Sequence, residues 1–160
     1  MNRFFFIIPL LLSCDSKKAE DICCVIIDAT MHFMVQNTDG TDLLNPGVGE
    51  IDVNSIKIWY RLKNGELQEV NNPNLTVSKG YTIITPESKS SRFYEVVIHL
   101  STQQHKDNIS YTYIQWAEND MDEVKTQFDR SHGNMLAEKI WINQDFVWQR
   151  GLEPLITLIK

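Results

Sequence analysis

Apolar and polar residues alternate along much of the chain, and this period of two is typical of strands that bury one face. The longest alternation covers residues 24–36, where every odd position from 25 to 35 is apolar and all polar residues occupy even positions. The pattern predicts one half-buried strand. It ends before Asp39-Gly40, a pair that favours a turn.

Two tight hairpins are predicted from turn residues that interrupt alternating runs. Residues 56–62 alternate and are followed by Asn64-Gly65, the strongest short hairpin signal in such a context, so they are expected to pair with residues 66–70. A second hairpin is predicted where Asn143-Gln144-Asp145 separates two apolar runs near the end of the sequence.

The remaining alternating runs complete an all-β pattern. They lie at residues 81–84, 93–100, 109–116 and 155–159. Residues 122–128 fit both helical and strand spacing, and we favour a strand. About eight short strands without a convincing long helix predict an antiparallel β-sandwich, Ig-like or related.

The first residues have the layout of a secretory signal. Arg3 precedes an apolar run over residues 4–12, and a small residue, Ser13, stands before Cys14. The apolar run is shorter than the roughly 20 residues that cross a bilayer. The string Leu11-Leu12-Ser13-Cys14 resembles a complete bacterial lipobox, in which the cysteine thiol takes the lipid.

This resemblance divides the chain into three parts. We expect residues 1–13 to be a lipoprotein signal peptide, residues 14–22 to be the lipidated Cys14 with a polar tether, and residues 23–160 to form one β-sandwich domain. The alternative is an ordinary signal peptide with a chance cysteine. A lipid anchor makes the membrane the first expected partner, since two or more acyl chains hold a protein stably.

The charge balance bears on other partners. The chain has 15 Lys and Arg against 21 Asp and Glu, for a net charge of −6. It has no basic stripe along any segment. Nucleic acid is therefore not expected as a partner, because phosphate binding depends on clustered cations.

Cys23 and Cys24 are adjacent, and side chains of neighbouring residues in a strand point to opposite faces. They are thus poorly placed to share a metal. A vicinal disulfide would be strained, and we favour two small apolar residues at a strand start.

Three further motifs stand out along the chain: Asp42-Leu43-Leu44-Asn45-Pro46, Ile114-Gln115-Trp116 followed by Asp120 and Asp122, and Ile140-Trp141-Ile142-Asn143. Together with the lipobox they resemble a family of uncharacterised small cell-envelope lipoproteins of Bacteroidota-type bacteria. The resemblance implies placement in the outer membrane and an all-β domain, and it brings no catalytic residues. The tether carries Lys17 and Lys18 where surface-exported lipoproteins of such bacteria are acidic, so surface and periplasmic orientations both stay open.

No motif for catalysis, a cofactor or a structural metal is apparent. The four histidines lack the spacing of a zinc site, no serine lies in a Gly-x-Ser-x-Gly turn, and no glycine-rich loop is followed by a phosphate-binding lysine. The acidic residues Asp120 and Asp122 could bind calcium. A plain solvated turn is favoured, because the stretch lacks the mid-loop glycine and later glutamate of a calcium loop.

Trp59 and Trp141 are the candidate ligand-binding residues. Each lies between core-facing residues of its predicted strand, so each is expected to point away from the main core. There they could form a platform on which sugar rings stack, or they could cover a second hydrophobic layer, which the general burial of tryptophan favours.

These observations predict a lipid-anchored envelope protein with a non-enzymatic binding or structural role. The alternatives are a carbohydrate-binding accessory lipoprotein that uses Trp59 and Trp141, and a hydrolase whose site is not visible in the sequence. Exposure of both tryptophans on one sheet face is expected for carbohydrate binding, whereas an apolar patch or an open edge strand is expected for an assembly role.

Overall fold

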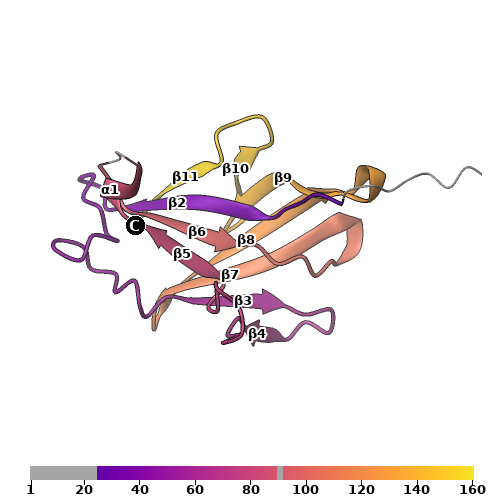
Figure 1. The fold of residues 1–160 in the computed structure, drawn as a ribbon, viewed down its shortest axis with the longest axis horizontal. Helices are drawn as coiled ribbons and strands as arrows, with labels where there is room; N and C mark the ends of the chain where they lie inside the picture. The colour runs from indigo at the N-terminus through magenta and orange to yellow at the C-terminus, as the bar shows by residue number, and fades with distance from the viewer. Residues whose placement is uncertain (1–24, 90–91) are drawn as a thin grey trace, which may run out of the picture.

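The computed structural model describes residues 25–89 and 92–160, and their strands form two β-sheets that face each other (Figure 1). The predicted signal peptide, Cys14, the tether and the pair Cys23-Cys24 lie outside these residues. Three short helical segments also occur, α1 (Pro86–Lys89), η1 (Lys106–Asn108) and η2 (Ser131–Gly133). The predicted all-β fold is confirmed.

The larger sheet has the strand order β1-β9-β8-β7-β3-β4, and β10 also pairs with β9. Its strands are β1 (Ile27–Asp28), β3 (Lys57–Arg61), β4 (Leu67–Glu69), β7 (Ile109–Ala117), β8 (Asp120–Asp129), β9 (Met135–Ile142) and β10 (Asp145–Gln149). The smaller sheet has the order β11-β2-β6-β5. Its strands are β2 (Thr30–Gln36), β5 (Tyr81–Ile84), β6 (Glu95–His99) and β11 (Leu155–Ile159).

A single hydrophobic core lies between the inner faces of the two sheets. β2 and β7 alternate between buried and half-buried residues, as expected for strands with one face against a core. Both sheets contribute fully buried side chains, including Phe33 from β2, Ile98 from β6, Trp116 from β7 and Phe128 from β8. The arrangement is that of a sandwich.

Most strand pairs are antiparallel, but two are parallel, so both sheets are mixed. β1 runs parallel to β9, and β11 runs parallel to β2. β11 does not form a hairpin with β10, because the chain turns at Gly151 and crosses to the other sheet. There the carbonyl of Pro154 accepts a hydrogen bond from the His32 amide (3.1 Å) and opens the parallel pairing.

The predicted single strand over residues 24–36 is instead divided between the sheets. Ile26 exchanges hydrogen bonds with residues 134 and 135 of the larger sheet, whereas the Ala29 carbonyl accepts from the Leu100 amide next to β6. The change of partner takes place at residues 28 and 29. As a result the odd-numbered face is not continuous: Ile27 is 63% exposed, and burial begins at Ala29.

Both hairpins predicted from turn residues are confirmed. The Asn64-Gly65 hairpin is present, with β3 and β4 paired and Gly65 at positive φ. The second hairpin joins β9 and β10 through Asn143 and Gln144, both at positive φ, as a two-residue turn requires. Residues 122–128 belong to strand β8, as favoured from the sequence.

The motif Asp42-Leu43-Leu44-Asn45-Pro46 forms an ordered loop after β2. The Asp42 carboxylate is buried and accepts hydrogen bonds from the amides of Leu44 (2.9 Å) and Tyr94 (2.7 Å). The loop then turns back on itself, and the Gly49 amide donates to the Asn45 carbonyl (2.7 Å). This motif therefore positions Leu44 in the core, and its role is structural.

Candidate functional site

Trp59 and Trp141 lie on the same face of the larger sheet, the face turned away from the core. Their strand neighbours Ile58, Ile140 and Ile142 are buried in the core, so the two tryptophans point outward, and both are half-buried. They therefore do not contribute to the core between the sheets. The other two tryptophans, Trp116 and Trp148, are buried.

A row of alternating cations and rings crosses this outer face and includes Trp141. We call it the aromatic-cation row: Arg61 of β3, Tyr111 of β7, Lys125 of β8, Trp141 of β9 and Phe146 of β10. The strand register pairs Tyr111 with Lys125, Lys125 with Trp141, and Trp141 with Phe146. The row therefore spans five strands.

Neighbouring side chains of the aromatic-cation row are in direct contact. The Arg61 guanidinium carbon lies 5.1 Å from the centre of the Tyr111 ring, and the Lys125 ammonium lies 4.8 Å from the centre of the Trp141 ring. Phe146 meets Trp141 edge to face, with the ring centres 5.7 Å apart. Cation-ring and edge-to-face contacts at these distances are attractive and hold each side chain against its neighbour.

Trp59 belongs to a neighbouring row on the same face. Its indole N–H donates to Oε1 of Gln115 (3.1 Å), and its cross-strand partner is Tyr113. The Tyr113 hydroxyl donates to the Glu123 carboxylate (2.7 Å). Burial, reinforced by this hydrogen bond and by the carboxylate charge, raises the pKa of Tyr113 to about 12, so its hydroxyl stays neutral and bound to Glu123.

The cations on this face differ in their partners. Lys57 forms an ion pair with Glu69 (3.8 Å). Among the described residues no carboxylate lies within ion-pair distance of Arg61 or Lys125. The charge of these two side chains in the aromatic-cation row is therefore not neutralised by a direct contact.

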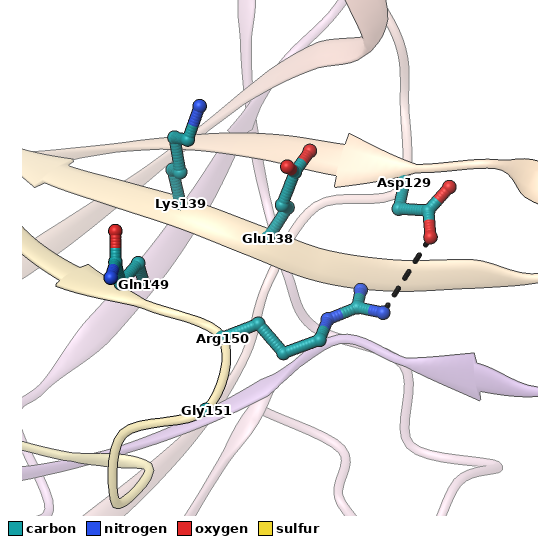
Figure 2. A pocket seen from close by; sticks show the side chains of 6 residues that line it. All are labelled: Asp129, Glu138, Lys139, Gln149, Arg150 and Gly151. Atoms are coloured by element: carbon teal, nitrogen blue, oxygen red, sulfur yellow. Dashed lines mark ion pairs between the residues drawn. The ribbon is translucent and has the colours of Figure 1, made fainter.

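A polar hollow of about 500 Å³ adjoins the row at the β9 and β10 side (Figure 2). It is lined by Asp129, Glu138, Lys139, Gln149, Arg150 and Gly151. Lys139 and Gln149 are cross-strand partners, and Lys139 lies two residues from Trp141 on the same strand face. The hollow thus places amide, carboxylate and ammonium groups close to the half-buried Trp141 on the same strand face.

Arg150 shapes one wall of this hollow. Its Nε and Nη2 donate to the Ala137 carbonyl (3.1 and 3.0 Å), and its Nη1 lies 3.6 Å from the Asp129 carboxylate (Figure 2). The Ala137 carbonyl lies where the pairing of β8 with β9 shifts register. The sequence carries no signal for this irregularity, and none of the hollow's residues was singled out from it.

The acidic stretch with Asp120 and Asp122 already holds a cation, the Lys160 ammonium. The buried Asp122 carboxylate accepts from the Trp116 indole (2.7 Å), the Asn143 amide (2.7 Å) and Lys160 (2.9 Å), and Lys160 also pairs with Asp120. We call this group the Asp122 network. It unites the two sheets, since Lys160 follows β11 and Asp122 lies in β8.

Electrostatics in the Asp122 network favour the ionised carboxylate. Burial alone raises the pKa of Asp122, but the hydrogen bonds from Asn143, Lys160 and Trp116 outweigh it, and the net pKa is lowered. Both oxygens of Asp122 are engaged by these donors. No group of three or more metal-ligating side chains occurs within the described residues.

On the smaller sheet, His32 Nδ1 lies 2.8 Å from the Glu95 carboxylate, beside a hollow of about 130 Å³ that Glu153 also lines. Among the ion pairs of the described residues, this is the contact that joins a histidine to a carboxylate, the pair of groups that acid-base catalysis commonly uses. His99, the other histidine in a strand of this sheet, is the last residue of β6.

Comparison of the chain with protein-family models, with curated proteins and with solved structures found no match. None of the helices in residues 25–89 and 92–160 has the length and apolar character needed to cross a membrane. The function of the outer face must therefore be inferred from its own chemistry.

Proposed function

We propose that this protein is a non-enzymatic, lipid-anchored protein of the cell envelope that binds carbohydrate on the outer face of its larger sheet. The observation that carries the proposal is the common orientation of Trp59 and Trp141. Both project from this face, together with Tyr111, Tyr113 and Phe146.

Sugars suit such a face because they are both apolar and polar. The C–H groups of a pyranose ring stack on aromatic rings, while the hydroxyls need hydrogen-bond partners at the side. Phe146 is 53% exposed and is held against Trp141. Glu138 and Gln149 in the adjoining hollow supply carboxylate and amide groups that bind hydroxyls.

The face is long enough for several sugar units. Trp59 and Trp141 lie on β3 and β9, which are separated by β7 and β8. Three strand spacings amount to about 14 Å. A short oligosaccharide laid across the strands would contact both tryptophans.

Removal of the Trp141 ring is expected to weaken polysaccharide binding about tenfold, which corresponds to about 1.4 kcal/mol. The measurement is affinity electrophoresis of the full chain against a panel of neutral and acidic soluble polysaccharides, with Trp141→Ala and Phe146→Ala compared with the parent. Ile159→Ala is the control, since Ile159 is 57% exposed on the other sheet. Retardation by no polysaccharide in the panel, or retardation that survives Trp141→Ala combined with Trp59→Ala, would contradict the proposal.

The lipid anchor is tested separately at Cys14. The native protein is expected to begin at an acylated Cys14 by intact mass and to fractionate with the outer membrane, because the lipobox directs cleavage and acylation there. Cys14→Ala is expected to stay unmodified and to leave the membrane fraction. A soluble, unmodified native protein would mean that the lipobox interpretation is wrong.

One feature favours an assembly role as a second candidate. Val25, Ile26 and Ile27 are consecutive and each more than half exposed at the start of β1, which lies at an edge of the larger sheet. Consecutive exposed apolar residues beside a sheet edge are a common docking point for a protein partner.

A further inference from the structure

We infer that the ligand of the outer face is an acidic glycan, a chain of uronic-acid type, and that Arg61 and Lys125 recognise its carboxylates. This inference rests on the proposed carbohydrate function and gives it a substrate class. It is carried by the juxtaposition of aromatic rings and cations without an ion-pair partner in the aromatic-cation row.

The two cations are presented differently from Lys57 and Arg150 on this face. Lys57 is paired with Glu69 and Arg150 with Asp129, so their charges are already matched. Lys57 also lies 5.9 Å from the centre of the Trp59 ring, whereas Arg61 and Lys125 lie against the Tyr111 and Trp141 rings without an ion-pair partner among the described residues. Arg61 also interacts with the Tyr113 hydroxyl, but a cation held against a ring keeps its remaining N–H groups available at the edge of the stacking surface.

Glu123, an acidic residue on the same face, does not neutralise either cation by a direct contact. Glu123 lies two residues before Lys125 on β8 and accepts the Tyr113 hydroxyl. It is not within ion-pair distance of either cation. In a chain of net charge −6, a row with two such cations is a local reversal of charge, and charge complementarity favours an anionic ligand.

The spacing within the row suits a polymer with repeated carboxylates. Arg61 on β3 and Lys125 on β8 are separated by β7, which puts them about 10 Å apart, close to the length of two pyranose units. Trp141 is half-buried, so a sugar that contacts its accessible part would lie beside Lys125 and could turn its carboxylate toward the ammonium. A later unit could then offer its carboxylate to Arg61, whose guanidinium binds carboxylates through two parallel hydrogen bonds.

A uronic acid also fits better than a polyphosphate. Single-stranded nucleic acid combines stacking bases with negative charge, but it needs a basic groove along its whole backbone. The outer face instead carries Glu69, Glu123, Asp129 and Glu138 around the row, and these would repel closely spaced phosphates. A glycan with one carboxylate per sugar has its negative charges farther apart, so these acidic residues would repel it less.

The test compares polygalacturonate with the same polymer after methyl esterification, which keeps the sugar backbone and removes the carboxylate charge. The full chain is expected to bind polygalacturonate at least tenfold more tightly than its ester, and added salt should narrow the difference. Arg61→Gln combined with Lys125→Gln should abolish the preference for the acid. Lys57→Gln, which removes a cation already paired with Glu69, should retain it.

Thermal melting of each variant checks the fold, and Lys125→Arg should keep the preference for the acid because it restores the charge. If the esterified polymer and a neutral β-glucan bind as tightly as the acid, the acidic class is overturned while carbohydrate binding stands. If no polysaccharide binds, both proposals fail. Tighter binding of oligothymidylate than of polygalacturonate would overturn both in favour of nucleic acid.

Discussion

Asp122→Ala is expected to lower the free energy of unfolding by about 3 kcal/mol, because removing one member of a buried ion pair leaves buried donors without partners and the other charge with only an exposed partner. Trp116 is fully buried, and its indole N–H would lose the Asp122 oxygen that it binds at 2.7 Å. The Lys160 ammonium would lose its buried partner on the opposite sheet and keep only the exposed Asp120. Urea unfolding followed by tryptophan fluorescence measures the loss.

The effect of this substitution should depend on pH in a defined direction. Folding lowers the pKa of Asp122, so the folded state binds the proton less readily than the unfolded state. The contribution of the carboxylate is therefore fully present above the unfolded pKa of about 3.9, and it is lost as the pH falls through the folded value. The difference between the parent and Asp122→Ala should shrink when unfolding is repeated below pH 4.

Asp120→Ala is the matched control. Asp120 also contacts Lys160, but its side chain is 41% exposed, and exposed ion pairs contribute about 1 kcal/mol or less. A similar loss for both substitutions would mean that the Asp122 network is no stronger than a surface contact. A difference that grows as the pH falls would contradict the lowered pKa.

Gly49→Ala is expected to destabilise the fold by about 3 kcal/mol or to prevent folding, because a clash with fixed backbone cannot be relieved by a rotamer change. A Cβ at Gly49 would lie 2.2 Å from the Leu43 carbonyl oxygen and 2.9 Å from that of Asn45. The backbone at Leu43 is held by hydrogen bonds with Val35 and Ile51. Circular dichroism and the thermal midpoint measure the outcome.

Gly47→Ala supplies the comparison two residues away in the same loop. A Cβ there would meet only the Asn45 side-chain oxygen at 3.4 Å, an ordinary contact. We expect a change within about 0.5 kcal/mol, as for most surface substitutions. Equal behaviour of the two variants would show that the loop can move away from the Gly49 contact.

The features that depended on nearby residues could be predicted from the sequence. The Asn64-Gly65 turn and the strand at residues 122–128 are set by local chemistry and by the side of the strand that is apolar. The division of residues 24–36 between two sheets could not be predicted. Its apolar alternation continues through residue 29, and only the partners Met135 and Leu100 reveal the change of sheet.

The candidate site, too, could be predicted from the sequence only in part. The outward direction of Trp59 and Trp141 follows from the buried isoleucines beside them. Their neighbours do not follow, because which residue faces Trp141 depends on the register of β8 and β10. The Asp122 network could not be predicted either, although it joins the motif that contains Trp116 and Asp122 to the separate motif that ends at Asn143.

The parallel pairing of β11 with β2 restricts the order in which this chain can fold. The antiparallel strands β7, β8 and β9 follow one another and can form as soon as they are made. β2 instead lies between β6 and β11, and its partner β11 is separated from it by nearly the whole described chain. Contacts of such long sequence separation form slowly. The smaller sheet therefore stays incomplete until residues 155–159 pair with β2. Until then, Phe33 on β2 lies in a partly open core.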